Sequence, residues 1–122
     1  MVLTGLPRGG TTLSCYLVGK ARNTVALNEP IRRDEFAHLL PDREAVAEGV
    51  ERYFRRARRN VESKGVVFSK HVSGTLSDAT FGTPNAEGVR KPVLQKGEIA
   101  VEKELGLDFF LVIKHPALFT AL

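Results

Sequence analysis

A glycine-rich segment between a short apolar run and a helical segment that is apolar on more than one face constrains this chain more than any other feature. Residues 2–14 read "VLTGLPRGGTTLS", and four residues separate Gly5 from Gly10. A strand followed by such a segment and then a helix is typical of phosphate-binding sites, because glycine lets backbone N–H groups converge on an anion. The segment therefore predicts an anion site at the carboxyl end of the first strand.

The position of the cation distinguishes this segment from the loops that bind nucleoside triphosphates. Those loops place Lys and then Ser or Thr after the last glycine. Here Thr11 and Thr12 follow Gly10, and the positive charge is Arg8, inside the loop. A guanidinium offers a fork of donors that suits phosphate or sulfate oxygens, and the two threonines add hydroxyl donors. We therefore expect an anion site that uses no metal ion, and no Cys/His spacing indicates a metal site elsewhere.

The order of apolar runs and helical patterns predicts an α/β fold with three layers, in which crossover helices cover a parallel sheet. We expect one domain over residues 1–122. The expected strands are 2–5, 24–30, 65–71 and 107–116. The expected helical segments are 11–21, 32–40, 42–64 and a helix that begins at Pro116. Residues 72–97 are rich in Gly, Ser, Thr, Pro and Asn and predict a long loop with irregular strand pairing at most.

The segment 42–64 carries the clearest helical pattern. Its apolar residues recur at three and four positions and form one stripe, which consists of Val46, Val50, Tyr53, Phe54, Ala57 and Val61. Arginines gather on the opposite face. Glu48 precedes Arg52 by four residues, and Glu51 precedes Arg55 by four, which is the favourable order for ion pairs along a helix. We interpret this face as solvated and ion-paired, with binding of nucleic acid as a more remote alternative.

Composition narrows the functional classes further. The formal net charge is +4, which suits an anionic ligand but does not by itself indicate nucleic acid. The single cysteine, Cys15, excludes an internal disulfide and fits a reducing compartment, and we expect its thiol to be buried. The longest apolar run, residues 109–113, is too short to span a membrane. Because "MVLTG" runs directly into the glycine-rich segment, we expect no signal peptide and a cytoplasmic protein.

The segment "GLPRGGTTL" resembles the 5′-phosphosulfate loop of sulfotransferases that use 3′-phosphoadenosine 5′-phosphosulfate (PAPS). Their usual pattern is Gly-x-Pro-Arg/Lys-Ser-Gly-Thr-Thr, and Gly9 stands here in place of the serine. The resemblance implies the sulfotransferase fold, which is similar to that of P-loop nucleoside triphosphatases. It implies PAPS as cofactor and adenosine 3′,5′-bisphosphate as product. The implied cofactor-binding residues are Pro7, Arg8, Gly9, Gly10, Thr11 and Thr12.

The same resemblance implies two alternatives for the catalytic base. In tyrosylprotein and many bacterial sulfotransferases, the base is a glutamate after the second strand, and "ALNEP" places Glu29 21 residues after Arg8. Cytosolic sulfotransferases instead use a histidine in a Lys-Thr-His context, and "FSKHV" offers Lys70 and His71. We expect Glu29 as the base, with His71 as the alternative and Arg8 stabilising the leaving phosphate. Lys70 and Lys114 would add positive potential.

The end of the sequence resembles a further sulfotransferase segment. "LVIKHPALFTAL" is similar to the Lys-Ser-Pro strand and helix that precede the strand binding the 3′-phosphate of the cofactor. The resemblance implies that this site lies beyond Leu122 and that the chain is the amino-terminal part of a catalytic domain. The expected activity is transfer of a sulfuryl group to a hydroxyl or amine of a small molecule or glycan. The alternative is a non-catalytic fragment that binds phosphate or sulfate.

Overall fold

The computed structural model describes residues 1–6, 9–32, 34–116 and 118. Its strands are β1 (Val2–Leu3), β2 (Thr24–Asn28), β3 (Val66–His71), β4 (Gln95–Ala100) and β5 (Phe110–Lys114). Its helices are α1 (Thr11–Gly19), α2 (Arg43–Lys64) and the short 3₁₀ helix η1 (Ala37–Leu39). The helical segment expected at 32–40 is therefore confined, within the described residues, to η1.

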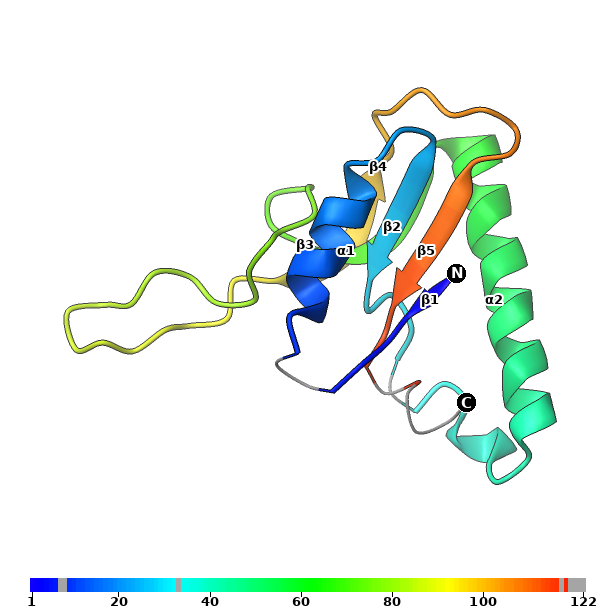
Figure 1. The fold of residues 1–122 in the computed structure, drawn as a ribbon, viewed down its shortest axis with the longest axis horizontal. Helices are drawn as coiled ribbons and strands as arrows, with labels where there is room; N and C mark the ends of the chain where they lie inside the picture. The colour runs from blue at the N-terminus through cyan, green and yellow to red at the C-terminus, as the bar shows by residue number, and fades with distance from the viewer. Residues whose placement is uncertain (7–8, 33, 117, 119–122) are drawn as a thin grey trace.

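A parallel sheet with the strand order β1-β5-β2 forms the centre of the molecule (Figure 1). Every residue of β2 is buried, because helices cover both faces of the sheet. Val25 and Leu27 pack on the α2 side, whereas Ala26 packs with Cys15 of α1 on the other side. The predicted α/β class, the parallel pairing and the burial of Cys15 are confirmed.

The strand at 65–71 was expected to join the parallel sheet, and this expectation is wrong. β3 pairs antiparallel with β4, which lies partly inside the segment 72–97 that was predicted to be a loop. β4 reads "QKGEIA", a mostly exposed and polar run that carries no strand signal of its own. Pairing with β3 stabilises it, so a tertiary contact overrides a weak local preference.

Helix α2 forms as its sequence predicts. The Asp42 carboxylate accepts a hydrogen bond from the backbone N–H of Ala45 at 3.0 Å, which caps the start of the helix. Gly65 ends it in the left-handed conformation, with φ of 63°. The predicted apolar stripe is buried or half-buried against the sheet. Both predicted ion pairs are present, with N–O distances of 3.4 Å for Arg52–Glu48 and 2.6 Å for Arg55–Glu51.

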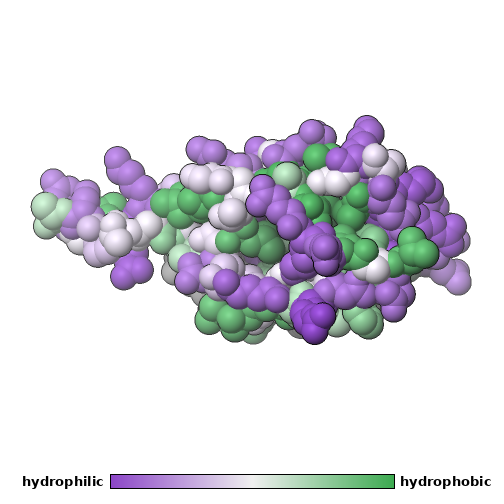
Figure 2. Space-filling model, turned by 90° about the horizontal axis from the view of Figure 1, so that it is seen from above, coloured by the Kyte–Doolittle hydropathy of each residue, from purple (hydrophilic) through white to green (hydrophobic). Residues whose placement is uncertain are grey.

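Residues 72–94 form an arm that projects from the rest of the molecule (Figure 1). Within the arm, the backbone N–H of Gly82 donates to the carbonyl of Lys91 at 3.0 Å, and that of Asn85 donates to Val89 at 2.9 Å. The arm is thus an irregular hairpin. Seen from above, hydrophilic residues cover most of it, and apolar ones are scattered among them (Figure 2).

The carboxyl-terminal strand is shorter than the expected 107–116. β5 begins at Phe110, and the preceding Leu107 is 95% exposed. The helix expected from Pro116 lies mostly outside the described residues, although Leu118 is buried against Val46 and Val50 of α2. Among the helices that the structure describes, none is long and apolar enough to cross a lipid bilayer.

Candidate functional site

The glycines between β1 and α1 each meet a local steric demand. Gly10 has φ of 75°, a left-handed conformation that side chains disfavour, and it precedes the first residue of α1. A Cβ atom on Gly9 would lie 3.0 Å from the carbonyl oxygen of Leu6, which itself accepts a hydrogen bond from the Gly9 N–H. The usual serine of the resembled pattern would therefore crowd this turn.

The backbone N–H groups in the first turn of α1 receive no hydrogen-bond acceptor from a capping side chain. Gly10 provides no side-chain cap, and the first turn contains no acidic residue. The positive end of the helix dipole is thus uncompensated there. The hydroxyl oxygens of Thr12 and Thr80 lie 3.3 Å apart, so the base of the arm contacts this turn. Pro7 and Arg8, two of the predicted cofactor-binding residues, lie outside the described residues.

Glu29 directly follows β2 and turns the chain sharply. Its φ is 46°, a left-handed conformation that is uncommon for a residue with a side chain. Its backbone N–H donates to the carbonyl of Lys114 at 2.7 Å, which continues the pairing of β2 with β5 by one residue. Backbone strain of this kind is often retained where a side chain must be held in place for function.

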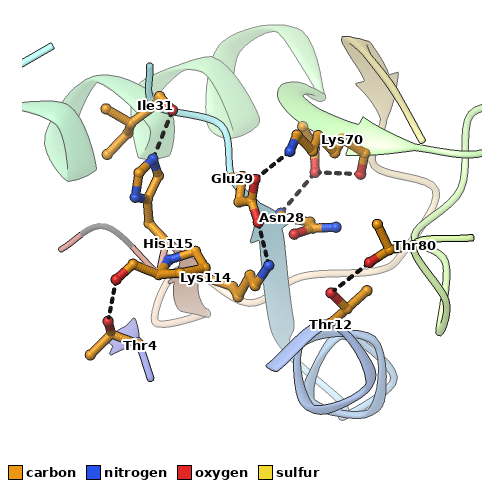
Figure 3. A network of polar contacts seen from close by, with 11 residues as sticks. Thr4, Thr12, Asn28, Glu29, Ile31, Lys70, Thr80, Lys114 and His115 are labelled. Atoms are coloured by element: carbon orange, nitrogen blue, oxygen red, sulfur yellow. Dashed lines mark hydrogen bonds and ion pairs between the residues drawn. The ribbon is translucent and has the colours of Figure 1, made fainter. Parts of the chain in front are cut away.

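Two lysines hold the Glu29 carboxylate from neighbouring strands (Figure 3). Lys114 of β5 donates to Oε1 at 2.5 Å, and Lys70 of β3 donates to Oε2. The side chain of Lys114 is 3% exposed, that of Glu29 is 20% exposed and that of Lys70 is 29% exposed. Three strands thus bring one carboxylate and two ammonium groups together at the carboxyl edge of β2 and β5.

This arrangement sets the protonation state of Glu29. Burial by itself would raise the pKa of the carboxyl, but the hydrogen bonds and charges of Lys114 and Lys70 outweigh it and lower the pKa to about 2. Glu29 is therefore ionised at neutral pH. With one carboxylate and two ammonium groups, the cluster carries a net positive charge that suits a further anion.

Asn28 was not among the residues predicted for the site. It is 1% exposed, and its side-chain Oδ1 and Nδ2 have no hydrogen-bond partner among the described residues. Its backbone N–H donates to the hydroxyl of Ser69 at 2.9 Å. A polar residue at the end of the otherwise apolar run "VAL" was the sequence signal that could have identified it.

The histidines lie around this cluster rather than within it. His71 accepts a hydrogen bond at Nδ1 from the backbone N–H of Gly74 at 3.0 Å, at the turn that leaves β3. Its role as alternative base stays a prediction. His115 is 3% exposed, and its Nε2 donates to the carbonyl of Ile31 at 2.9 Å. Burial lowers the pKa of His115, so its ring is neutral at pH 7.

In comparisons of both its sequence and its structure, no family model, curated protein or solved structure matches this chain. Within the described ranges, no three His, Cys, Asp or Glu side chains gather in a way that could hold a metal ion.

A second basic region lies at the opposite end of β2, and the charge of its Lys103 is used to bind backbone carbonyl groups. A hollow of about 830 Å³ there is lined by Lys20, Arg22, Asn23 and residues 103–106. The Lys103 ammonium donates to the carbonyl oxygens of Gly19, Ala21 and Thr24 at 2.5, 2.9 and 2.9 Å. Lys103 thus closes the end of α1.

Proposed function

We propose that this chain binds PAPS at the segment 5–12 and transfers its sulfuryl group to a hydroxyl or amine acceptor. The observation that carries the proposal is the position of the Glu29–lysine cluster. It lies at the carboxyl edge of a parallel sheet, where α/β proteins bind their ligands, and β1 and its glycine turn lead into α1 at the same edge. When bound, PAPS supplies an activated sulfuryl group with adenosine 3′,5′-bisphosphate as the leaving group.

The described residues fit the anionic end of such a cofactor. The N–H groups around Gly9, Gly10 and Thr11 would donate to its oxygens, because α1 starts there without a side-chain cap. The hydroxyls of Thr11 and Thr12 would add donors. By the resemblance stated above, Arg8 would stabilise the charge that develops on the leaving phosphate.

Glu29 would accept the proton of the acceptor hydroxyl or amine. In its present surroundings the carboxylate is a weak base, because Lys70 and Lys114 stabilise its ionised form. An anion bound beside the lysines would compete for their charge and raise the pKa of Glu29. Glu29 would then become a stronger base when the donor anion is in place.

The second candidate function is binding of phosphate or sulfate without catalysis. It is favoured by one observation, which is that both carboxylate oxygens of Glu29 are already held by lysines. A group held in this way can simply complete a buried ion-pair network. The two functions differ in turnover, whereas both require an anion at the first turn of α1.

Calorimetric titration with adenosine 3′,5′-bisphosphate tests the binding step. We expect micromolar binding to the unmodified chain and to Arg55→Ala, an exposed control whose partner is Glu51. We expect no binding to Arg8→Ala. Unchanged affinity in Arg8→Ala would exclude the proposed loop. Absence of binding both to the unmodified chain and to a chain extended past Leu122 would overturn PAPS as the cofactor.

Turnover separates catalysis from binding alone. PAPS is incubated with panels of phenols, sugars and amines, and release of adenosine 3′,5′-bisphosphate is followed by ion-exchange chromatography. We expect Glu29→Gln to keep nucleotide binding and to lose about 10²- to 10⁴-fold in rate, whereas His71→Ala keeps its rate. The opposite pattern would make His71 the base. Binding without acceptor-dependent release would favour the non-catalytic function.

A further inference from the structure

The amide of Asn28, at this edge of the sheet, is a buried polar group that no described residue satisfies. Both its polar atoms are buried without a partner among the described residues, whereas Glu29, Lys70 and Lys114 beside it are all paired. An unpaired buried donor or acceptor destabilises the folded state, because its lost hydrogen bonds to water are not replaced. Asparagine is also unfavourable in a strand, and the three preceding residues are apolar.

Strand geometry places this amide on the α1 side of the sheet. Side chains alternate along β2, so Asn28 shares a face with Ala26, which packs against Cys15 of α1. Asn28 lies at the carboxyl end of this face, in register with Lys114. In Figure 3 its amide lies between the Glu29 cluster and the Thr12–Thr80 hydroxyl pair.

The surroundings of the amide suit an anion. The uncapped start of α1 offers a positive dipole end, and Lys114 is a buried cation in the adjacent strand. The donor Nδ2 would add a neutral hydrogen bond that is strengthened when its acceptor carries charge. A carboxylate at this position would repel an anion, and an aliphatic side chain would offer it nothing.

We propose that Asn28 is a ligand-binding residue, with Nδ2 donating to an oxygen of a tetrahedral sulfate or phosphate group held at the first turn of α1. The amide costs stability in the free protein and is satisfied when the anion binds. The inference rests on the oxyanion-binding part of the proposed function and adds a residue to it. It does not depend on PAPS being the source of the anion.

The test combines affinity with stability, because the two respond differently to a ligand residue and to a structural one. Asn28→Leu keeps the branched shape of the side chain and its number of heavy atoms, and it removes both polar atoms. We expect it to weaken binding of inorganic sulfate about tenfold or more by calorimetry. We also expect its urea unfolding midpoint to equal or exceed that of the unmodified chain, because the unpaired amide is gone.

Asn23→Leu is the matched control at the other end of β2. The Asn23 amide is fully used, since Nδ2 donates to Asp108 at 3.0 Å and Oδ1 accepts from the Gly106 N–H at 2.7 Å. This variant should lose stability and keep sulfate affinity. If Asn28→Leu behaves in the same way, Asn28 is structural and the proposal is overturned. Should Asn28→Leu not fold, Asn28→Asp is used, and sulfate affinity equal to that of the unmodified chain would overturn the proposal.

Titration of the same proteins with adenosine 3′,5′-bisphosphate separates this inference from the proposed function. Binding of sulfate that depends on Asn28, without binding of the nucleotide by this chain or by one extended past Leu122, supports the inference and overturns PAPS as cofactor. Equal binding of sulfate and nucleotide by the unmodified chain and Asn28→Leu overturns the inference alone. Failure of the unmodified chain and of the extended chain to bind either ligand overturns both.

Discussion

Lys114 and Glu29 form two hydrogen bonds: the Lys114 ammonium donates to Oε1 of Glu29 at 2.5 Å, and the Lys114 backbone carbonyl accepts the Glu29 N–H at 2.7 Å. The ammonium is almost fully buried, so it has no access to water as an alternative partner. The carboxylate is therefore required for the stability of β5 as well as available for chemistry. Removal of one partner from such a pair leaves a buried charge uncompensated.

The first prediction concerns stability and pH. The folded pKa of Glu29 is about 2, below its usual 4.5, so its contribution is complete above pH 4.5 and is lost as pH falls toward 2. We expect Glu29→Gln to unfold about 3 kcal/mol more easily at pH 7 and to show a smaller loss between pH 5 and 2. Urea unfolding across this pH range measures the free energy of unfolding at pH 7 and its change between pH 5 and 2.

The control is Glu48→Gln, which breaks only an exposed pair with Arg52 and should keep the pH dependence of the unmodified chain. The same pH dependence in Glu29→Gln would contradict the assignment.

The two lysines are predicted to contribute unequally to the pKa of Glu29. Lys114 makes the larger contribution and is nearly buried, whereas Lys70 is partly exposed. We expect the pKa of Glu29 to rise in both Lys114→Met and Lys70→Met, and to rise more in Lys114→Met. Titration of the carboxyl carbon by ¹³C NMR measures this directly. A larger rise in Lys70→Met would show that the exposed lysine dominates the site.

The third prediction concerns the glycine at the start of α1. A Cβ atom on Gly10 meets nothing within 4 Å, so Gly10→Ala tests its left-handed φ of 75° alone. We expect a loss of about 1 kcal/mol in stability and weaker binding of sulfate, because the alanine shifts the N–H groups of the turn. Gly65→Ala, at the left-handed end of α2, is the control. It should lose similar stability and keep sulfate binding, and an equal loss of binding in both would indicate a global effect.

Local sequence patterns were sufficient to predict α2, β2 and β5. The stripe and charge order of α2 are set by spacing along one helix, and Asp42 and Gly65 mark its ends. β2 and β5 are short apolar runs that can be read directly. β4 could not be predicted, because "QKGEIA" becomes a strand only through its partner β3. The pairing of β4 with β3 cannot be predicted from the residues of β4 alone.

The sequence predicted individual residues of the candidate site but not the contacts between them. Glu29 was predicted as the base, with Lys70 and Lys114 adding positive potential, and the structure brings these three side chains together. Their mutual contacts and the resulting low pKa of Glu29 depend on the order of strands in space. Asn28 left only the weak signal of a polar residue after "VAL", and its burial is visible only in the structure. Thr80 was missed because a contact across 68 residues defines it.

The last prediction uses the thiol of Cys15 to report how firmly α1 is fixed to the sheet. Cys15 packs with Ala26 and Val112 one turn beyond the start of the helix, so its protection requires that the helix stays in place. Burial raises the pKa of its thiol to about 11, against about 9 for an ordinary cysteine. We expect a disulfide reagent at pH 8 to react at least 100-fold more slowly with the folded chain than with the chain in urea. Because the reactive thiolate is both scarce and covered in the folded protein, the reaction then proceeds through opening of α1.

Sulfate bound at the first turn of α1 should slow the reaction of Cys15 further, since a ligand that binds only the closed helix disfavours the open one. Reaction of the folded chain at the rate seen in urea would show that α1 is not held on the sheet, and no anion site could then be built on its first turn.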